Sequence, residues 1–138
     1  MTDVVAHRKV AALRGRIARI GELLPSTADR FIADRTPAEA LILNLFVALQ
    51  DASDLAMHLV ADGGLGVPGD ARGAYELLGR AGVVTPDLAR RLAAAVGLRN
   101  RIAHEYGGLD LGLVYEAARD DLGDLEAFAA AAAATFGR

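Results

Sequence analysis

Residues 85–108, TPDLARRLAAAVGLRNRIAHEYGG, contain the complete signal of one long amphipathic helix. Thr85 can cap its start, Pro86 fits its first turn, and the two glycines at 107 and 108 stop it after about Tyr106. With an advance of about 100° per residue, one face carries the apolar side chains within roughly 80° of Leu88. They are Leu88, Leu92, Ala95, Val96, Ile102, Ala103 and Tyr106. This pattern predicts a helix packed on one side against other helices.

Arg99 interrupts this apolar face, because it projects only about 20° from Leu88. A guanidinium buried without a partner costs several kcal/mol, so Arg99 must be paired or must face a cleft or a subunit boundary. Asn100 and His104 are four residues apart at the edge of the same face. We therefore expect these three residues and Tyr106 to surround one pocket. Arg99 and His104 lie about 140° apart, so they meet only through the long arginine side chain or a distorted helix end.

The rest of the chain shows the same helical signals. We expect a first helix over about residues 3–23 and a second over about 36–61, with Thr36 as its cap, Pro37 in its first turn and Glu39 completing a capping box. The glycine-rich stretch 63–69 is a loop, since no strand precedes it and no Lys-Ser/Thr pair follows.

A short third helix follows Asp70 and ends at Gly82, and the last helix runs from Asp110 to about Phe136. The sequence thus predicts an all-α, up-and-down antiparallel bundle of four long helices and one short one, in a single domain over residues 1–138.

The second helix is apolar around most of its circumference, and one narrow polar strip contains Asn44, Asp51, Asp54 and His58, with Gln50 at its margin. Either this strip is a solvent-exposed face, or it faces the helix of Arg99, where Asp51 or Asp54 could pair with the guanidinium. Asp54 and His58 are helical neighbours, but no third ligand follows at suitable spacing, so no metal site and no cofactor are expected.

The composition narrows the function classes. The net charge is −3, so no overall basic field indicates nucleic-acid binding, although arginines gather in the first twenty residues and carboxylates near the end. Either the basic beginning of the chain attracts RNA or an acidic partner, or both charged segments are simply solvent-exposed faces of helices. The chain lacks cysteine, which excludes disulfides and thiol chemistry. A polar, basic N-terminus predicts no signal peptide, and we expect a cytoplasmic protein without a membrane span.

The segment Arg99-Asn100-Arg101-Ile102-Ala103-His104-Glu105-Tyr106 resembles the Arg-x4-His-x-Tyr signature of the HepT-like toxins, a branch of the HEPN ribonucleases. Two further features fit that family. One is the Asp-x3-His pattern of Asp54 and His58, and the other is the stretch 75–128 with Asp110 and Val114-Tyr115-Glu116. The resemblance extends over nearly the whole chain.

The resemblance implies a metal-independent endoribonuclease with a HEPN-like fold, working as a toxin. The 2′-hydroxyl of the RNA would attack the adjacent phosphate, with His104 as general acid and base and Arg99 stabilising the phosphate charge. Asn100 would orient either His104 or the phosphate. The family's symmetric homodimer would bring two copies of the motif to one cleft. The implied partner is a MntA-like nucleotidyltransferase antitoxin, which would neutralise the toxin by attaching AMP to Tyr106.

Two other interpretations stay open at this point. The chain could be a non-catalytic HEPN-type module in which Arg99 and His104 contact a nucleotide or a protein. It could also be a structural helical protein, with Arg99 joining two helices or subunits and His104 interacting with the helix dipole.

Overall fold

The computed structural model describes residues 3–136 and shows this part of the chain as helical, without strands. Its elements are α1 (Val4–Leu23), α2 (Ala28–Ala33), α3 (Arg35–Asp62), α4 (Ala71–Arg80), α5 (Pro86–Glu105), the 3-10 turn η1 (Tyr106–Gly108) and α6 (Leu111–Phe136). The all-α prediction is confirmed.

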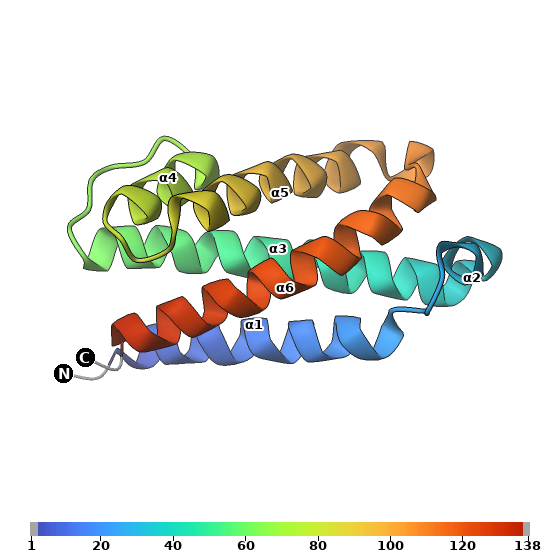
Figure 1. The fold of residues 1–138 in the computed structure, drawn as a ribbon, viewed down its shortest axis with the longest axis horizontal. Coiled ribbons are helices and arrows are strands. Elements are labelled where there is room, and N and C mark those ends of the chain that lie inside the picture. The colour runs from blue at the N-terminus through green and yellow to red at the C-terminus, as the bar shows by residue number, and fades with distance from the viewer. Residues whose placement is uncertain (1–2, 137–138) are drawn as a thin grey trace.

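The four long helices run up and down beside one another, and the beginning of α1 and the end of α6 lie at the same end of the bundle (Figure 1). The short α4 lies against the beginning of α5 at that end, whereas α2 closes the opposite end. This is the predicted arrangement of four long helices and one short one, with α2 as an additional element.

Helix α3 occupies the centre and contacts each of the other five α-helices. Eleven of its residues are buried. They share an apolar side chain and point in several directions around the helix: Ala38, Leu41, Ile42, Leu45, Ala48, Leu49, Ala52, Leu55, Ala56, Leu59 and Val60. Packing this surface against several neighbours removes a large apolar area from water and dominates the stability of the bundle.

Helix α3 is also long and apolar enough, by length and composition, to cross a membrane. The expectation of a protein without a membrane span stays a prediction, since this criterion uses length and composition only. The central helix of a bundle meets the same criterion, because it must present apolar side chains to neighbours on several sides. The contacts of α3 with all the other α-helices account for its composition.

Three predicted helix starts are confirmed by their capping bonds. The Thr85 hydroxyl accepts a hydrogen bond from the Leu88 amide at 3.1 Å, and Asp70 accepts one from Gly73 at 2.9 Å. Asp110 likewise accepts from Leu113 at 3.2 Å. Each bond satisfies an amide that has no acceptor within its helix.

The predicted start of α3 was wrong. The helix begins at Arg35, so Thr36 and Pro37 both lie within its first turn, and Glu39 accepts from the Arg35 guanidinium at 3.0 Å instead of closing a capping box. The first amides of a helix need no intrahelical acceptor, which lets proline occupy several positions there. Sequence reasoning also missed α2, which Thr27 caps by accepting from the Arg30 amide.

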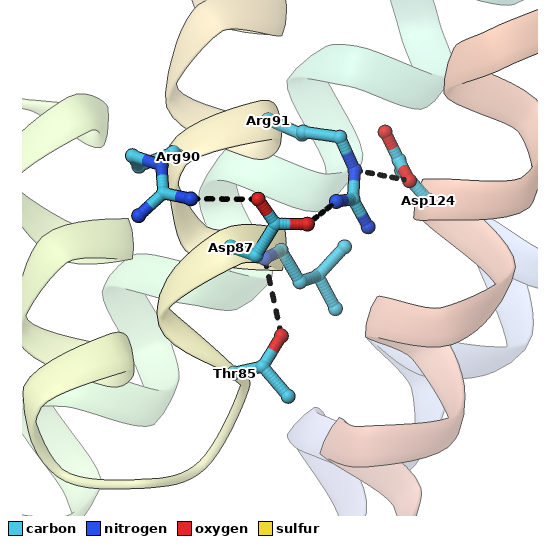
Figure 2. A network of polar contacts seen from close by, with 6 residues as sticks. Thr85, Asp87, Arg90, Arg91 and Asp124 are labelled. Atoms are coloured by element: carbon cyan, nitrogen blue, oxygen red, sulfur yellow. Dashed lines mark hydrogen bonds and ion pairs between the residues drawn. The ribbon is translucent and has the colours of Figure 1, made fainter.

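A network of charged side chains joins α5 to α6 on the surface (Figure 2). The guanidinium of Arg91 donates to Asp87 on its own helix and, at 3.0 Å, to Asp124 on α6. Arg90 adds a second pair with Asp87 at 2.7 Å. Because Asp87, Arg90 and Arg91 are largely exposed, each pair contributes at most about 1 kcal/mol, and the network mainly orients α5 relative to α6.

Stability should fall as the pH rises through the titration of Asp121 on α6. Burial, followed by the negative charges of the nearby Asp124 and Asp120, raises the pKa of this carboxyl from 3.8 to about 6. Between these two pKa values the folded protein keeps a proton that the unfolded chain has lost, so deprotonation favours unfolding.

We expect Asp121→Asn to raise the free energy of unfolding at pH 7.5 by about 1 kcal/mol, a value discounted for partial solvent exposure. The gain should vanish near pH 3.5, where Asp121 is protonated in both states. Urea unfolding at the two pH values measures it, with Glu116→Gln, an exposed position on the same helix, as the control. An equal gain at both pH values would contradict the assignment to Asp121.

Candidate active site

Three contacts fix the Arg99 guanidinium at the boundary between α5 and α3. Its Nε donates to Gln50 Oε1 at 2.9 Å, and one terminal nitrogen donates to Asn100 Oδ1 at 3.1 Å. The guanidinium carbon also lies 5.2 Å from the centroid of the Phe46 ring. All three partners are uncharged, and among residues 3–136 no ion pair involves Arg99. The guanidinium is therefore oriented while its charge is not neutralised.

Gln50 connects Arg99 to Asp54. Its amide nitrogen donates to Asp54 Oδ1 at 3.1 Å while its oxygen accepts from Arg99, which fixes the orientation of the amide. The expectation that Asp51 or Asp54 pairs directly with Arg99 was wrong, because the uncharged Gln50 occupies that place. Phe46, Gln50 and Asp54 follow one another at intervals of four, the spacing of one helix face, and this spacing could have identified them.

The polar strip of α3 divides between two neighbouring helices. Asn44, Asp51 and His58 are seven residues apart and lie on the side that faces α1. There Asn44 accepts from Arg16 at 3.0 Å, and His58 Nε2 lies 2.7 Å from Asp3 Oδ2. Asp51 and His58 therefore do not contact Arg99, as one interpretation of the strip required. Nor is the strip simply a solvent-exposed face.

Asp51 is half-buried on that side of α3. Burial raises the pKa of its carboxyl, while Arg16 of α1 acts in the opposite direction. The pairing of α3 polar residues with basic residues of α1 accounts for part of the arginine cluster in the first twenty residues. These contacts are structural and lie away from the helix that carries Arg99.

Asp3, His58 and Asp62 bring their ligand atoms within 4.8 Å of one another at the end of the bundle. Sequence reasoning found no third ligand for His58, since Asp3 is 55 positions away. Asp3 also caps α1 by accepting from the Ala6 amide at 3.0 Å, and this bond, followed by the contact with His58, lowers the pKa of Asp3. The arrangement ties the start of α1 to the end of α3.

A polar pocket of about 500 Å³ adjoins the Arg99 guanidinium. Residues from α3, the beginning of α4 and α5 line it: Gln50, Ser53, Asp70, Ala71, Arg72, Val96, Arg99 and Asn100. Sequence reasoning did not single out Ser53 or Arg72, because nothing in the local pattern near either residue places it beside Arg99.

Tyr106 lines a different cavity, an apolar groove of about 560 Å³ between α3 and α5. Its side chain is 48% exposed, and the groove also includes Leu43, Phe46 and Ile102. Phe46 separates the two cavities, since its ring contacts Arg99 and also lines this groove. The expectation that the four motif residues surround one pocket is therefore met by Arg99 and Asn100 but not by His104 or Tyr106.

His104 lies in the last turn of α5 and is exposed. Within the described residues its ring makes no hydrogen bond, so both ring nitrogens can accept or donate to a ligand. Immediately after it, α5 ends at Glu105 and the chain tightens into η1, which carries Tyr106. A single chain thus offers one oriented cation and one accessible imidazole, on different sides of the same helix end.

Comparisons with known proteins agree on one family. The family model described as Ribonuclease HepT-like matches residues 13–132. An mRNA nuclease HepT of Shewanella oneidensis is 31% identical over 128 residues, covering 93% of this chain and 95% of that protein.

Among solved structures, a tri-AMPylated HEPN toxin of Shewanella oneidensis in complex with MNT antitoxin superimposes with a TM-score of 0.86 and 30% identity, covering 96% of this chain and 98% of the other. A toxin–antitoxin structure with AMP-PNP superimposes with a TM-score of 0.86 and 29% identity, covering 96% of this chain and 99% of the other.

We expect Arg99→Ala to fold normally and to lower the free energy of unfolding by about 1 kcal/mol, the value of a hydrogen bond and some packing. Arg99 holds no buried ion pair whose removal would strand a charge. Urea unfolding measures the change, and Arg101→Ala, which removes an exposed arginine of the same helix, is the control. A decrease of more than roughly 3 kcal/mol in the free energy of unfolding would instead indicate that Arg99 has a structural role.

Proposed function

The chain belongs to the HepT-like ribonuclease family, and from this premise we propose that it is a metal-independent endoribonuclease toxin of a HepT/MntA-type toxin–antitoxin system. The observation that carries the proposal is the Arg99 guanidinium, which is fixed in orientation by Gln50, Asn100 and Phe46 and yet not neutralised. A cation held in this way, with its charge free, suits the binding of a phosphate.

The proposed reaction uses the RNA's own nucleophile. The 2′-hydroxyl gives its proton to an imidazole and attacks the adjacent phosphorus, the bond to the 5′ oxygen breaks, and that oxygen takes up a proton. The products are a 2′,3′-cyclic phosphate and a free 5′-hydroxyl. Arg99 stabilises the charge on the phosphate oxygens in the transition state, and His104 transfers the protons as general acid and base.

Asn100 has a positioning role in this proposal. Its side-chain oxygen accepts from Arg99, which leaves its amide nitrogen available to donate to a phosphate oxygen. Because Asn100 is one residue after Arg99 and four before His104, it can also orient the imidazole when substrate is bound.

A homodimer would complete the site. One imidazole per chain is few for a reaction that moves one proton from the nucleophile and another to the leaving oxygen, and a second copy would supply another. The groove beside the motif supports this assembly, since its apolar residues Leu43 (60% exposed) and Tyr106 (48% exposed) are open to a partner surface.

The proposed regulator is an MNT nucleotidyltransferase of the kind present in the related structures. It would join the α-phosphate of ATP to the Tyr106 oxygen, with release of pyrophosphate. The added AMP would place bulk and negative charge at the same helix end as Arg99 and His104, and so would hinder RNA by contact and by repulsion. Tyr106 is accessible to such an enzyme. We place the pair in the cytoplasm, where RNA and ATP are available.

We expect His104→Ala to abolish RNA cleavage and growth arrest without unfolding the chain, because His104 is exposed and makes no contact on which the fold depends. Induction in a bacterial host, with growth and RNA integrity followed together, measures the effect. His7→Ala, which removes another exposed imidazole, should remain toxic. Persisting cleavage by His104→Ala would exclude the proposed proton transfer, and a harmless wild type with intact RNA would favour a non-catalytic module.

We expect Tyr106→Phe to escape neutralisation, since the ring is retained and only the acceptor oxygen is lost. Purified variant, cognate nucleotidyltransferase and ATP are incubated together, and intact mass reports added AMP. Tyr115→Phe is the control, because that tyrosine is buried and its hydroxyl donates to the Pro25 carbonyl at 2.7 Å. AMP added to Tyr106→Phe at the wild-type level would assign the modification to another residue.

A further inference from the structure

We propose that the polar pocket beside Arg99 binds a second phosphate of the RNA strand, next to the scissile one, and that Arg72 on α4 holds it. This inference rests on the proposed ribonuclease function and deepens it, since it extends substrate binding to a residue outside the Arg-x4-His-x-Tyr motif.

Arg72 reaches the pocket through a gap in the surface of α5. A methyl group built on Gly97 would lie 3.2 Å from a terminal nitrogen of Arg72, so the guanidinium rests directly over this glycine. Gly97 and Arg99 project from different sides of α5, about 160° apart, but the long side chains of Arg72 and Arg99 both line the pocket. Arg72 and Arg99 therefore enter the same pocket from two different helices.

The charges around the pocket favour an anion. Within residues 3–136, neither Arg72 nor Arg99 forms an ion pair, and Arg99 donates only to amide oxygens. One carboxylate, that of Asp70, lines the pocket, and its Oδ1 already accepts from the Gly73 amide at 2.9 Å. Two guanidinium groups thus face one carboxylate that is partly engaged as a helix cap.

The neutral donors of the pocket suit a phosphodiester. The Ser53 hydroxyl and the Asn100 amide line the same pocket as the two arginines, and both groups can donate to phosphate oxygens. In a strand whose scissile phosphate is bound at Arg99, the neighbouring phosphate is covalently tethered close by. Contacts to such flanking phosphates set the register of the strand without reading its sequence. Arg72 therefore contributes to substrate binding rather than to the chemical step.

Binding of a non-cleavable RNA tests this role. We expect Arg72→Gln to weaken the binding of a 2′-O-methyl oligonucleotide about five- to tenfold at low salt, because one phosphate contact is lost. The slope of log affinity against log salt concentration should fall by about 0.7, the value for one phosphate on a single strand. Arg80→Gln is the matched control, since it removes the same charge from the other end of α4.

Two further measurements separate this role from a general effect of charge. Gly97→Ala keeps the charge and requires the Arg72 guanidinium to shift by only a few tenths of an ångström, so it should bind RNA nearly as tightly as the wild type, whereas Arg72→Gln should not. In steady-state cleavage of a natural RNA, Arg72→Gln should raise KM and leave kcat unchanged. Circular dichroism confirms that each variant is folded.

The outcomes distinguish this inference from the proposed function. If Arg72→Gln and Arg80→Gln behave alike, or if the salt slope does not change, the second phosphate site is overturned while cleavage by Arg99 and His104 stands. A lowered kcat with unchanged KM would also overturn it, because Arg72 would then act in the chemical step. If the wild type neither binds nor cleaves RNA, both the inference and the proposed function fail.

Discussion

Covering the apolar surface of α3 is the constraint on which the rest of the structure depends. Buried side chains point from this helix in several directions, and every other α-helix packs against it. The free energy gained by removing this surface from water is non-directional, so it fixes the grouping of the helices more strongly than their rotations. The rotations are set by the few polar positions of α3, which must either reach solvent or find partners.

Those polar positions give α3 two different edges. Asn44 accepts from Arg16 of α1, and His58 contacts Asp3, the cap of that helix, so this edge is structural. Gln50 faces α5 and accepts from Arg99, and this edge forms the candidate site. The same helix therefore stabilises the bundle on one side and orients the guanidinium on the other. An uncharged amide at Gln50 suits this second task, because a carboxylate there would compete with a phosphate for Arg99.

Phe46 separates the surroundings of the motif into two chemically distinct cavities. On one side lies the polar pocket with Arg72 and Arg99, and on the other the apolar groove with Tyr106. The proposed function uses both cavities, the first for phosphates and the second for contact with another protein surface. In the proposed homodimer, the site on a single chain would be half of a larger assembly, and His104 is exposed at the end of α5.

Local chemistry determined much of this protein from the sequence alone. The caps at Asp70, Thr85 and Asp110, the all-α class and the anomaly at Arg99 each depend on residues within a turn or two of one another, and helical periodicity reads such spacings directly. The family resemblance likewise rested on local patterns, the motif at the end of one helix together with the Asp54/His58 spacing and the stretch 75–128.

The tertiary structure decided which side chains contact one another. Gln50 lies 49 positions from Arg99 and Asp3 lies 55 from His58, so no local spacing relates them. Helix rotation also decided that Asp51 and His58 face α1 and that Arg72 lies over Gly97 beside Arg99. Side chains separated by 100° on one helix meet different neighbours, and which neighbours these are depends on how the whole apolar core packs.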